Sequence, residues 1–191
     1  MGPVFLGGKN MRFLLGLSRA IDALTAGVGR LVVWLVLLVA LLSAGNAILR
    51  YGFNYSSNAY LEAQWYMFSL IFLLGGAYAL KHNAHVRIDL LFGRFSRRTQ
   101  AWIDVVGTVL FLLPMALGVL YLAWPWAMNS LAIREMSPDV GGLPRWPIKL
   151  AVVLGFALLL LQGVSELIKR IAFLTGHRPT PWDEVEKEVL E

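Results

Sequence analysis

Residues 105–133, VVGTVLFLLPMALGVLYLAWPWAMNSLAI, are the stretch that decides the fold. These 29 residues lie between Asp104 and Arg134 and contain no charged side chain. A helix that crosses the hydrocarbon core of a bilayer needs roughly 17–25 predominantly apolar residues. The stretch is therefore long enough for a complete membrane span.

The same absence of charge recurs in three other intervals of the chain. They hold 19, 18 and 16 residues, and they are bounded by Arg30 and Arg50, by Glu62 and Lys81, and by Lys149 and Glu166. The apolar pattern of the last interval continues past Glu166 to Leu174. We therefore predict an all-α integral membrane bundle of four transmembrane helices, with spans near residues 31–49, 60–80, 104–128 and 148–170.

The composition supports a chain that uses lipid as its main solvent. Hydrophobic residues make up 58% of the 191 residues and charged residues only 15%, whereas soluble domains carry about 25% charged residues. A soluble chain of this length could not bury four such helices on all sides. Disorder is excluded too, because it requires low hydrophobicity and high charge.

The basic residues predict the orientation in the membrane. Thirteen of the 17 Lys and Arg residues fall in three segments: the N-terminal segment, the segment between spans two and three, and the C-terminal tail. Only four fall on the other side, namely Arg50, Arg134, Arg145 and Lys149. The positive-inside rule then places both termini in the cytoplasm. It also explains the net charge of +5 without a nucleic-acid partner.

Residues 11–30 carry an amphipathic pattern. Apolar residues recur at steps of three and four, with polar residues between them; the apolar set is Leu14, Leu17, Ile21, Leu24, Val28 and Leu31. Gly27 and Gly29 favour a bend before span one, because glycine is a poor helix-interior residue. We predict an N-terminal amphipathic helix lying in the headgroup plane, with a cytoplasmic extension of span one as the alternative.

These patterns divide the chain into three parts. We expect a basic N-terminal segment with its amphipathic helix over residues 1–30 and a four-span membrane domain over residues 31–174. An acidic cytoplasmic tail over residues 175–191 follows, with the signals of a short helix beginning at Thr180.

Residue types that carry catalysis or ion transfer are scarce. The chain has no cysteine, and its carboxylates near the spans, Glu62, Asp104 and Glu166, fall close to span ends rather than at mid-depth. Its three histidines form no ligand pattern with a carboxylate. No glycine-rich phosphate loop or serine elbow is present. We therefore expect no enzymatic activity, no cofactor and no metal.

A polar cluster follows span two at residues 81–91, KHNAHVRIDLL. Arg87 and Asp89 stand two positions apart and do not face each other on a helix. Each is expected to pair elsewhere, for example with another subunit. The alternative is a cluster of charges that only fixes the topology.

Together these features resemble the small membrane subunit (DctQ-like) of tripartite ATP-independent periplasmic (TRAP) transporters, a bacterial inner-membrane protein. The resemblance covers about residues 12–175 and rests on sequence elements in the spans and their connections. These elements are EAQW at 62–65, AYAL at 77–80, HVRIDL at 85–90, Trp102 with Asp104, GLPRWP at 142–147, Gly155-Phe156 and Gln162-Gly163.

The resemblance implies a role and a set of partners. A periplasmic substrate-binding protein would deliver an organic acid to a large membrane subunit, which would carry it inward with sodium, while this chain would act as scaffold beside it. Contacts to the large subunit, the binding protein or membrane lipids are expected at Glu62, Gln64, Trp65, Arg87, Asp89 and Arg145. An independent homo-oligomeric carrier and a non-transport assembly protein remain as alternatives.

Overall fold

The computed structural model describes residues 8–84 and 94–182. These residues form helices and no strand, which confirms the all-α prediction. The helices are α1 (Gly8–Gly52), α2 (Asn58–Lys81), α4 (Arg97–Gly107), α5 (Leu113–Ala132) and α6 (Trp146–Leu174), with a π-helical turn, η1 (Thr108–Leu112), between α4 and α5.

Four helical segments of the described chain are long and apolar enough to cross a membrane. They are Lys9–Gly52, Asn58–Lys81, Arg97–Ala132 and Trp146–Leu174. Each of the four predicted spans lies within one of them, so the four-span architecture is confirmed. The third segment joins α4, η1 and α5 into one helical rod.

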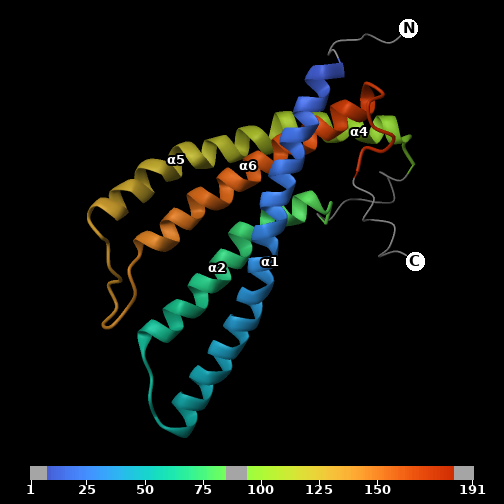
Figure 1. Ribbon diagram of the computed structural model, residues 1–191. Helices are drawn as coiled ribbons and strands as arrows, with labels where there is room; N and C mark the ends of the chain where they lie inside the picture. Colours follow the sequence, from blue (N-terminus) through green and yellow to red (C-terminus); the bar gives the residue numbers. More distant parts are fainter. Residues whose placement is uncertain (1–7, 85–93, 183–191) are drawn as a thin grey trace.

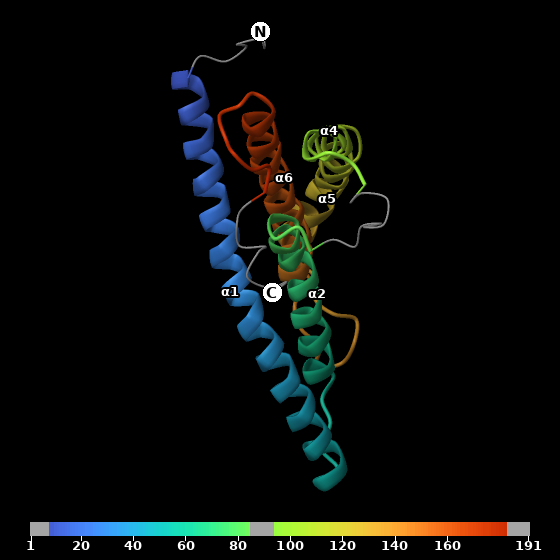
Figure 2. The same ribbon diagram turned by 90° about the vertical axis from the view of Figure 1, so that its right-hand side faces the viewer.

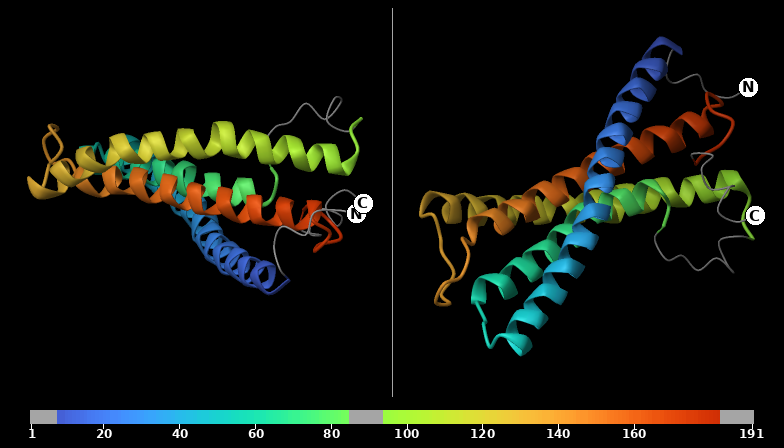
Figure 3. Two further views of the ribbon diagram at one scale, coloured as in Figure 1. Left: turned by 90° about the horizontal axis from the view of Figure 1, so that it is seen from above. Right: turned by 60° about the horizontal axis from the view of Figure 1, so that its bottom comes forward.

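The helices form two antiparallel pairs, α1 with α2 and α5 with α6 (Figure 1). Helix α6 lies between α1 on one side and α5 on the other, as Figure 2 and the two views of Figure 3 show. The start of α1, the end of α2, helix α4 and the end of α6 lie at one end of the bundle, called the terminal end below. The connections 53–57 and 133–145 lie at the other, called the loop end.

Helix α6 is the centre of the bundle because small residues let its neighbours approach. In the most apolar stretch of α6, 44% of the residues are buried inside the chain, whereas the corresponding share is at most 11% in the other three spans. A side chain added at Gly155 would lie 2.9 Å from the backbone oxygen of Leu73 in α2. One added at Gly163 would lie 2.7 Å from the Leu112 side chain in η1. Small residues at interfaces are the usual means of close helix packing in lipid.

The predicted bend at Gly27 and Gly29 is wrong. Helix α1 continues through both glycines as a single helix of 45 residues, so no separate N-terminal helix turns away from span one. Gly29 instead lets α1 and α2 approach each other closely, because a side chain at this position would overlap the ring of Tyr78 in α2. The Lys81 ammonium also donates a hydrogen bond of 3.1 Å to the backbone oxygen of Asp22, which ties the end of α2 to α1.

The face that α1 packs against the bundle is partly polar. Leu17 and Leu24 of the apolar set are exposed, whereas Ile21 of the same set is buried. Ser18 and Thr25 are buried against α6. Lipid explains the difference: it solvates leucine as well as a protein core does, whereas a hydroxyl needs a hydrogen-bond partner.

The third rod changes its helical winding near its first proline. The π-turn η1 ends at Leu112, and Pro114 follows in the first turn of α5. Proline lacks a backbone donor and disturbs the preceding turn, which accounts for the change of winding before it. The helix predicted after Thr180 falls on residues 183–191, outside the described part of the chain.

Candidate functional site

At the loop end, the carboxylate of Glu62 joins α2 to the connection between α5 and α6. Glu62 stands in the second turn of α2 and is 3% exposed. It accepts hydrogen bonds from the hydroxyl of Ser137 and from the backbone N–H of Leu143, the latter at 2.5 Å. The Arg145 guanidinium lies 3.4 Å away. Hydrogen bonds to an ionised carboxylate are the strong class of hydrogen bond.

Two further bonds from α2 hold the same connection. The Tyr66 hydroxyl donates to the Pro144 backbone oxygen at 2.7 Å, and the Asn58 amide donates to the Val140 backbone oxygen at 3.0 Å. The connection is itself folded back, with a bridge between Met136 and Pro144. We call this arrangement the loop-end latch, and its side chains are Asn58, Glu62, Tyr66, Ser137 and Arg145.

A second ion pair lies beside the latch. The Lys149 ammonium bonds the Glu135 carboxylate and lies 4.6 Å from the centre of the Trp126 ring. The bond from Lys149 is the main cause that lowers the pKa of Glu135 below its ordinary value of 4.5. Arg145 in turn lies 5.3 Å from the Trp65 ring centre. Arg145 and Lys149 therefore each have a carboxylate and a tryptophan as neighbours.

At the terminal end, polar side chains join α1 to α6. The Ser18 and Ser165 hydroxyls are 2.7 Å apart, and Ser165 also donates to Asp22 at 2.8 Å. The Gln162 amide accepts from Thr25 at 2.7 Å and donates to Asp22 at 2.9 Å. Because its donors and its acceptor are all used, the amide is satisfied in an apolar environment.

Buried charges continue this contact toward α4. Lys169 pairs with Asp22 at 3.1 Å and with Glu166 at 2.5 Å. Arg170 pairs with Glu166 at 2.8 Å and with Asp104 of α4 at 3.1 Å. Both cations are at most 5% exposed. We call the charged and amide residues of this contact the terminal network, namely Asp22, Asp104, Gln162, Glu166, Lys169 and Arg170.

The segment after α6 folds back onto this network. Arg170 donates to the backbone oxygen of Pro181 at 2.5 Å, and the Trp182 indole donates to Asp104 at 3.4 Å. The Trp182 ring centre lies 5.7 Å from the guanidinium carbons of both Arg97 and Arg170. Residues beyond the fourth span are thus part of the packed terminal end.

These two sites join helices and carry no reaction machinery. In residues 8–84 and 94–182 no three His, Asp or Glu side chains gather into a group that could hold a metal ion. Each buried carboxylate of the terminal network faces a cation or a hydrogen-bond donor of the same chain. The arrangement stabilises a bundle whose outer faces are apolar.

Comparison with known proteins identifies the family. Residues 39–173 match the family described as "Tripartite ATP-independent periplasmic transporters, DctQ component". The chain belongs to the DctQ family. It is also 26% identical over 137 residues to a curated protein of Haemophilus influenzae that carries the provisional name of TRAP transporter small permease protein. That match covers 72% of this chain and 83% of the relative.

Membership fixes the broad role of this DctQ chain. It is a small permease component of a TRAP transporter and not an enzyme. Four apolar helices together with this family indicate a multi-pass protein of the inner membrane. The predicted family and transport class are confirmed.

The residues predicted as partner contacts of the DctQ chain fall into three groups. Glu62 and Arg145 meet in the loop-end latch, and Trp65 stands beside Arg145 with 38% of its surface exposed. Gln64 is half-buried on α2. Arg87 and Asp89 lie outside the described residues. A role for these six residues in contacts with other molecules stays a prediction.

The terminal network is the feature that sequence reasoning missed. Its α6 members follow a helical stripe, with Gln162 three to four residues before Ser165 and Glu166, and these in turn before Lys169 and Arg170. A complementary polar stripe, Ser18, Asp22 and Thr25, runs along α1. Two polar stripes in one membrane chain are the signal that could have paired these helices.

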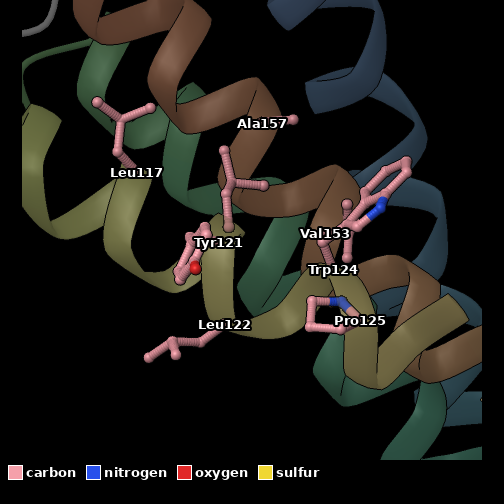
Figure 4. Close-up of a pocket in the computed structure, with 8 residues that line it drawn as sticks. Leu117, Tyr121, Leu122, Trp124, Pro125, Val153 and Ala157 are labelled. Atoms are coloured by element: carbon pink, nitrogen blue, oxygen red, sulfur yellow. The ribbon is translucent and has the colours of Figure 1, made fainter. Parts of the chain in front are cut away.

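Outside the two polar sites, the surface of the DctQ chain has an apolar hollow of about 650 Å³ between α5 and α6 (Figure 4). Its wall includes Tyr121, Trp124 and Pro125 from α5 and Val153 and Ala157 from α6, and it contains no charged side chain. Such a surface suits lipid chains or apolar side chains of a partner.

Proposed function

We propose that this chain is the scaffold subunit that supports the large membrane subunit of a TRAP transporter during sodium-driven uptake of an organic acid. A periplasmic substrate-binding protein would deliver the acid. In this proposal the substrate and the sodium ions bind the other two proteins, and this chain supplies a rigid surface in the membrane.

The observation that carries the proposal is the way the chain uses its buried charges. Asp22, Asp104 and Glu166 are close to cations of the same chain at the terminal end, and Glu62 is held in the loop-end latch. A carrier that moves sodium or protons by itself would be expected to keep an ionisable group for that purpose within its spans. Here those groups hold helices together, which suits a scaffold.

The outer faces support the same role. Large apolar side chains cover α1, α2, η1 and α5 and are 60–80% exposed at several positions, including Trp34, Phe72, Phe111 and Tyr121. A surface of this kind can face both lipid and a large membrane partner. The proposed orientation has the terminal end in the cytoplasm, because thirteen of 17 basic residues belong to that side.

Co-purification and uptake test the proposal together. The tagged chain, extracted from native membranes in mild detergent, should bring down a large membrane protein with many more spans. Vesicles with the large subunit and the binding protein should take up an organic acid with sodium only when this chain is present. Uptake by vesicles that contain this chain alone would instead favour the independent carrier. A chain that purifies alone and whose loss leaves uptake unchanged would favour an assembly protein.

The chain's lack of cysteine allows a clean test of orientation. Ser56→Cys reports on the connection 53–57 at the loop end, and Phe95→Cys reports on the terminal end before α4. We expect a membrane-impermeant maleimide added to intact spheroplasts to label the first variant and not the second. The opposite pattern would invert the proposed topology.

A further test addresses the segment between α2 and α4. The Arg87→Ala/Asp89→Ala double variant should lower recovery of the large subunit or uptake if these residues contact that partner. Equal recovery and equal uptake would remove them from the interface. The scaffold role of the rest of the chain would then be tested by the co-purification experiment alone.

A further inference from the structure

A groove at the loop end combines an apolar wall with two cations. It has a volume of about 730 Å³, within the range of about 300–1,000 Å³ that is usual for small-molecule sites. Phe68, Phe72 and Leu73 of α2 form one wall, and Ile148 and Val152 of α6 form part of the other. Arg145, Lys149 and their neighbours Trp65 and Trp126 also line it.

The polar and apolar parts of the groove are separated along the helices. Arg145 and Lys149 stand at the beginning of α6, where the chain enters the membrane from the connection 133–145. The apolar wall extends deeper, because Phe72 lies two turns beyond Trp65 on α2, about 10 Å along the helix axis. Tryptophans concentrate at the level of lipid headgroups. The cations therefore stand at headgroup depth, and the apolar wall extends toward acyl-chain depth.

The polar end presents two cationic side chains to the groove. Arg145 stands at the N-terminus of α6 and Lys149 lies in its first turn, and both line the groove. A guanidinium and an ammonium that line one groove favour an anionic oxygen, because hydrogen bonds from cations to oxyanions are the strong class.

We propose that this groove is a phospholipid site. A phosphate oxygen accepts from the Arg145 guanidinium and from the Lys149 ammonium, which both line the groove, and one acyl chain lies between Phe68, Phe72 and Val152. Glu62 and Glu135 already balance the two cations, so the site recognises the phosphate by its hydrogen bonds and does not require a lipid with net negative charge. A bound lipid there would stiffen the contact between α2 and α6 at the loop end.

The apolar hollow of Figure 4 provides the internal comparison. It has a similar volume of about 650 Å³ but no cation, so lipid there should exchange with the bulk bilayer. The proposal predicts a difference between these two surfaces, whereas ordinary solvation by lipid predicts none.

The test uses a phospholipid that carries a photoreactive diazirine on one acyl chain. The full chain is reconstituted in nanodiscs with this probe, irradiated, and mapped by mass spectrometry of its peptides. We expect labelling of residues 65–73 and 148–152 to exceed that of residues 117–125 by about tenfold. One hydrogen bond to a charged group changes binding affinity by about this factor. Equal labelling of both surfaces would overturn the proposal.

Two variants and one matched control separate the parts of the site. Lys149→Gln should lower groove labelling by about tenfold by removing a phosphate donor. Ser69→Phe should lower it by filling the groove, since Ser69 lines it and its hydroxyl bonds only the backbone oxygen of Trp65 among the described contacts. Ala157→Phe fills the hollow of Figure 4 instead and should leave groove labelling unchanged. Equal labelling in the wild type and Ser69→Phe would contradict the site.

Competition distinguishes a lipid from a free anion. Glycerol 3-phosphate and inorganic phosphate have the phosphate without the acyl chain, and they should not displace the probe at millimolar concentration. Displacement by either would show a small-anion site and overturn the lipid proposal. Circular dichroism and the thermal midpoint of each variant confirm that labelling is compared between folded proteins.

Discussion

The two ends of the bundle bury carboxylates in different ways. At the terminal end, Asp104 and Glu166 contact the side-chain cation of Arg170, and the Asp104 pair links α4 to α6. At the loop end, Glu62 meets a hydroxyl, a backbone N–H and the edge of a guanidinium, all from the connection before α6. The first site joins helix to helix, whereas the second joins a helix to a loop. The terminal end should therefore govern global stability and the loop end local order.

The largest expected effect comes from removing the cation shared at the terminal end. Arg170→Met removes the buried cation that pairs with Asp104, and it leaves Glu166 with Lys169 as its cationic partner. Breaking a buried ion pair from one side costs about 3–5 kcal/mol. We expect a loss of this size in the free energy of unfolding, measured by denaturant titration in detergent micelles.

An exposed arginine on α4 provides the control for this prediction. Arg98→Met removes the same charge from the surface of α4. Its effect should stay within about 0.5 kcal/mol. Similar effects of the two substitutions would mean that the terminal network adds no specific stability.

The second prediction concerns the latch. Glu62→Gln keeps one acceptor but removes the charge that receives the Ser137 and Leu143 donors. Hydrogen bonds to a charged group contribute about 1.5–3 kcal/mol, so we expect a loss in that range. Hydrogen exchange of residues 133–145 should become faster, while exchange of residues 162–170 stays unchanged. Equal acceleration at both ends would contradict the proposed division between global and local roles.

A third prediction tests the helix contact that runs between the two sites. Gly155→Ala places a methyl group 2.9 Å from the Leu73 backbone oxygen, so α2 and α6 must separate. Overpacking of this kind costs about 1–3 kcal/mol. Gly118→Ala in α5 is the control, because its added methyl group meets no neighbour and glycine is unfavourable inside a helix. Thermal midpoints should fall for the first variant and hold or rise for the second.

The sequence was sufficient for the spans because the bilayer fixes their length. An uncharged interval long enough to cross the hydrocarbon core has few other structures available, so each predicted span lies inside an observed helix. The pattern of apolar residues says less about which face of a membrane helix packs against its neighbours. Of the apolar set on α1, Ile21 is buried, whereas Leu17 and Leu24 are exposed; the polar Ser18 and Thr25 are buried as well. Hydrogen-bond requirements decide the contact of α1 with α6.

The candidate residues show the same limit. Glu62 and Arg145 were singled out separately, and their meeting in space depends on a connection that folds back. Its backbone bonds run from the Ser137 N–H to the Leu143 oxygen and from the Arg145 N–H to the Glu135 oxygen. Asp22 was not singled out, and its partners Gln162 and Lys169 stand about 140 positions later in the chain. Long-range pairing of this kind has no local signal, although matched polar stripes on two spans would have suggested it.

The smallest expected effect is a dependence on pH at the loop end. Bonding to Lys149 lowers the pKa of Glu135 below 4.5, so its ionised form contributes stability that is present above pH 4.5 and is lost as the pH falls through the lower folded-state value. Hydrogen exchange of residues 133–145, corrected for the intrinsic pH dependence of exchange, should therefore lose protection below pH 4.5. Glu135→Gln should have less of this loss, because the titrating group is gone. If the variant and the wild type lose protection in parallel, the dependence belongs to another carboxylate of the loop end, and the Glu135–Lys149 pair is only a surface contact beside the latch.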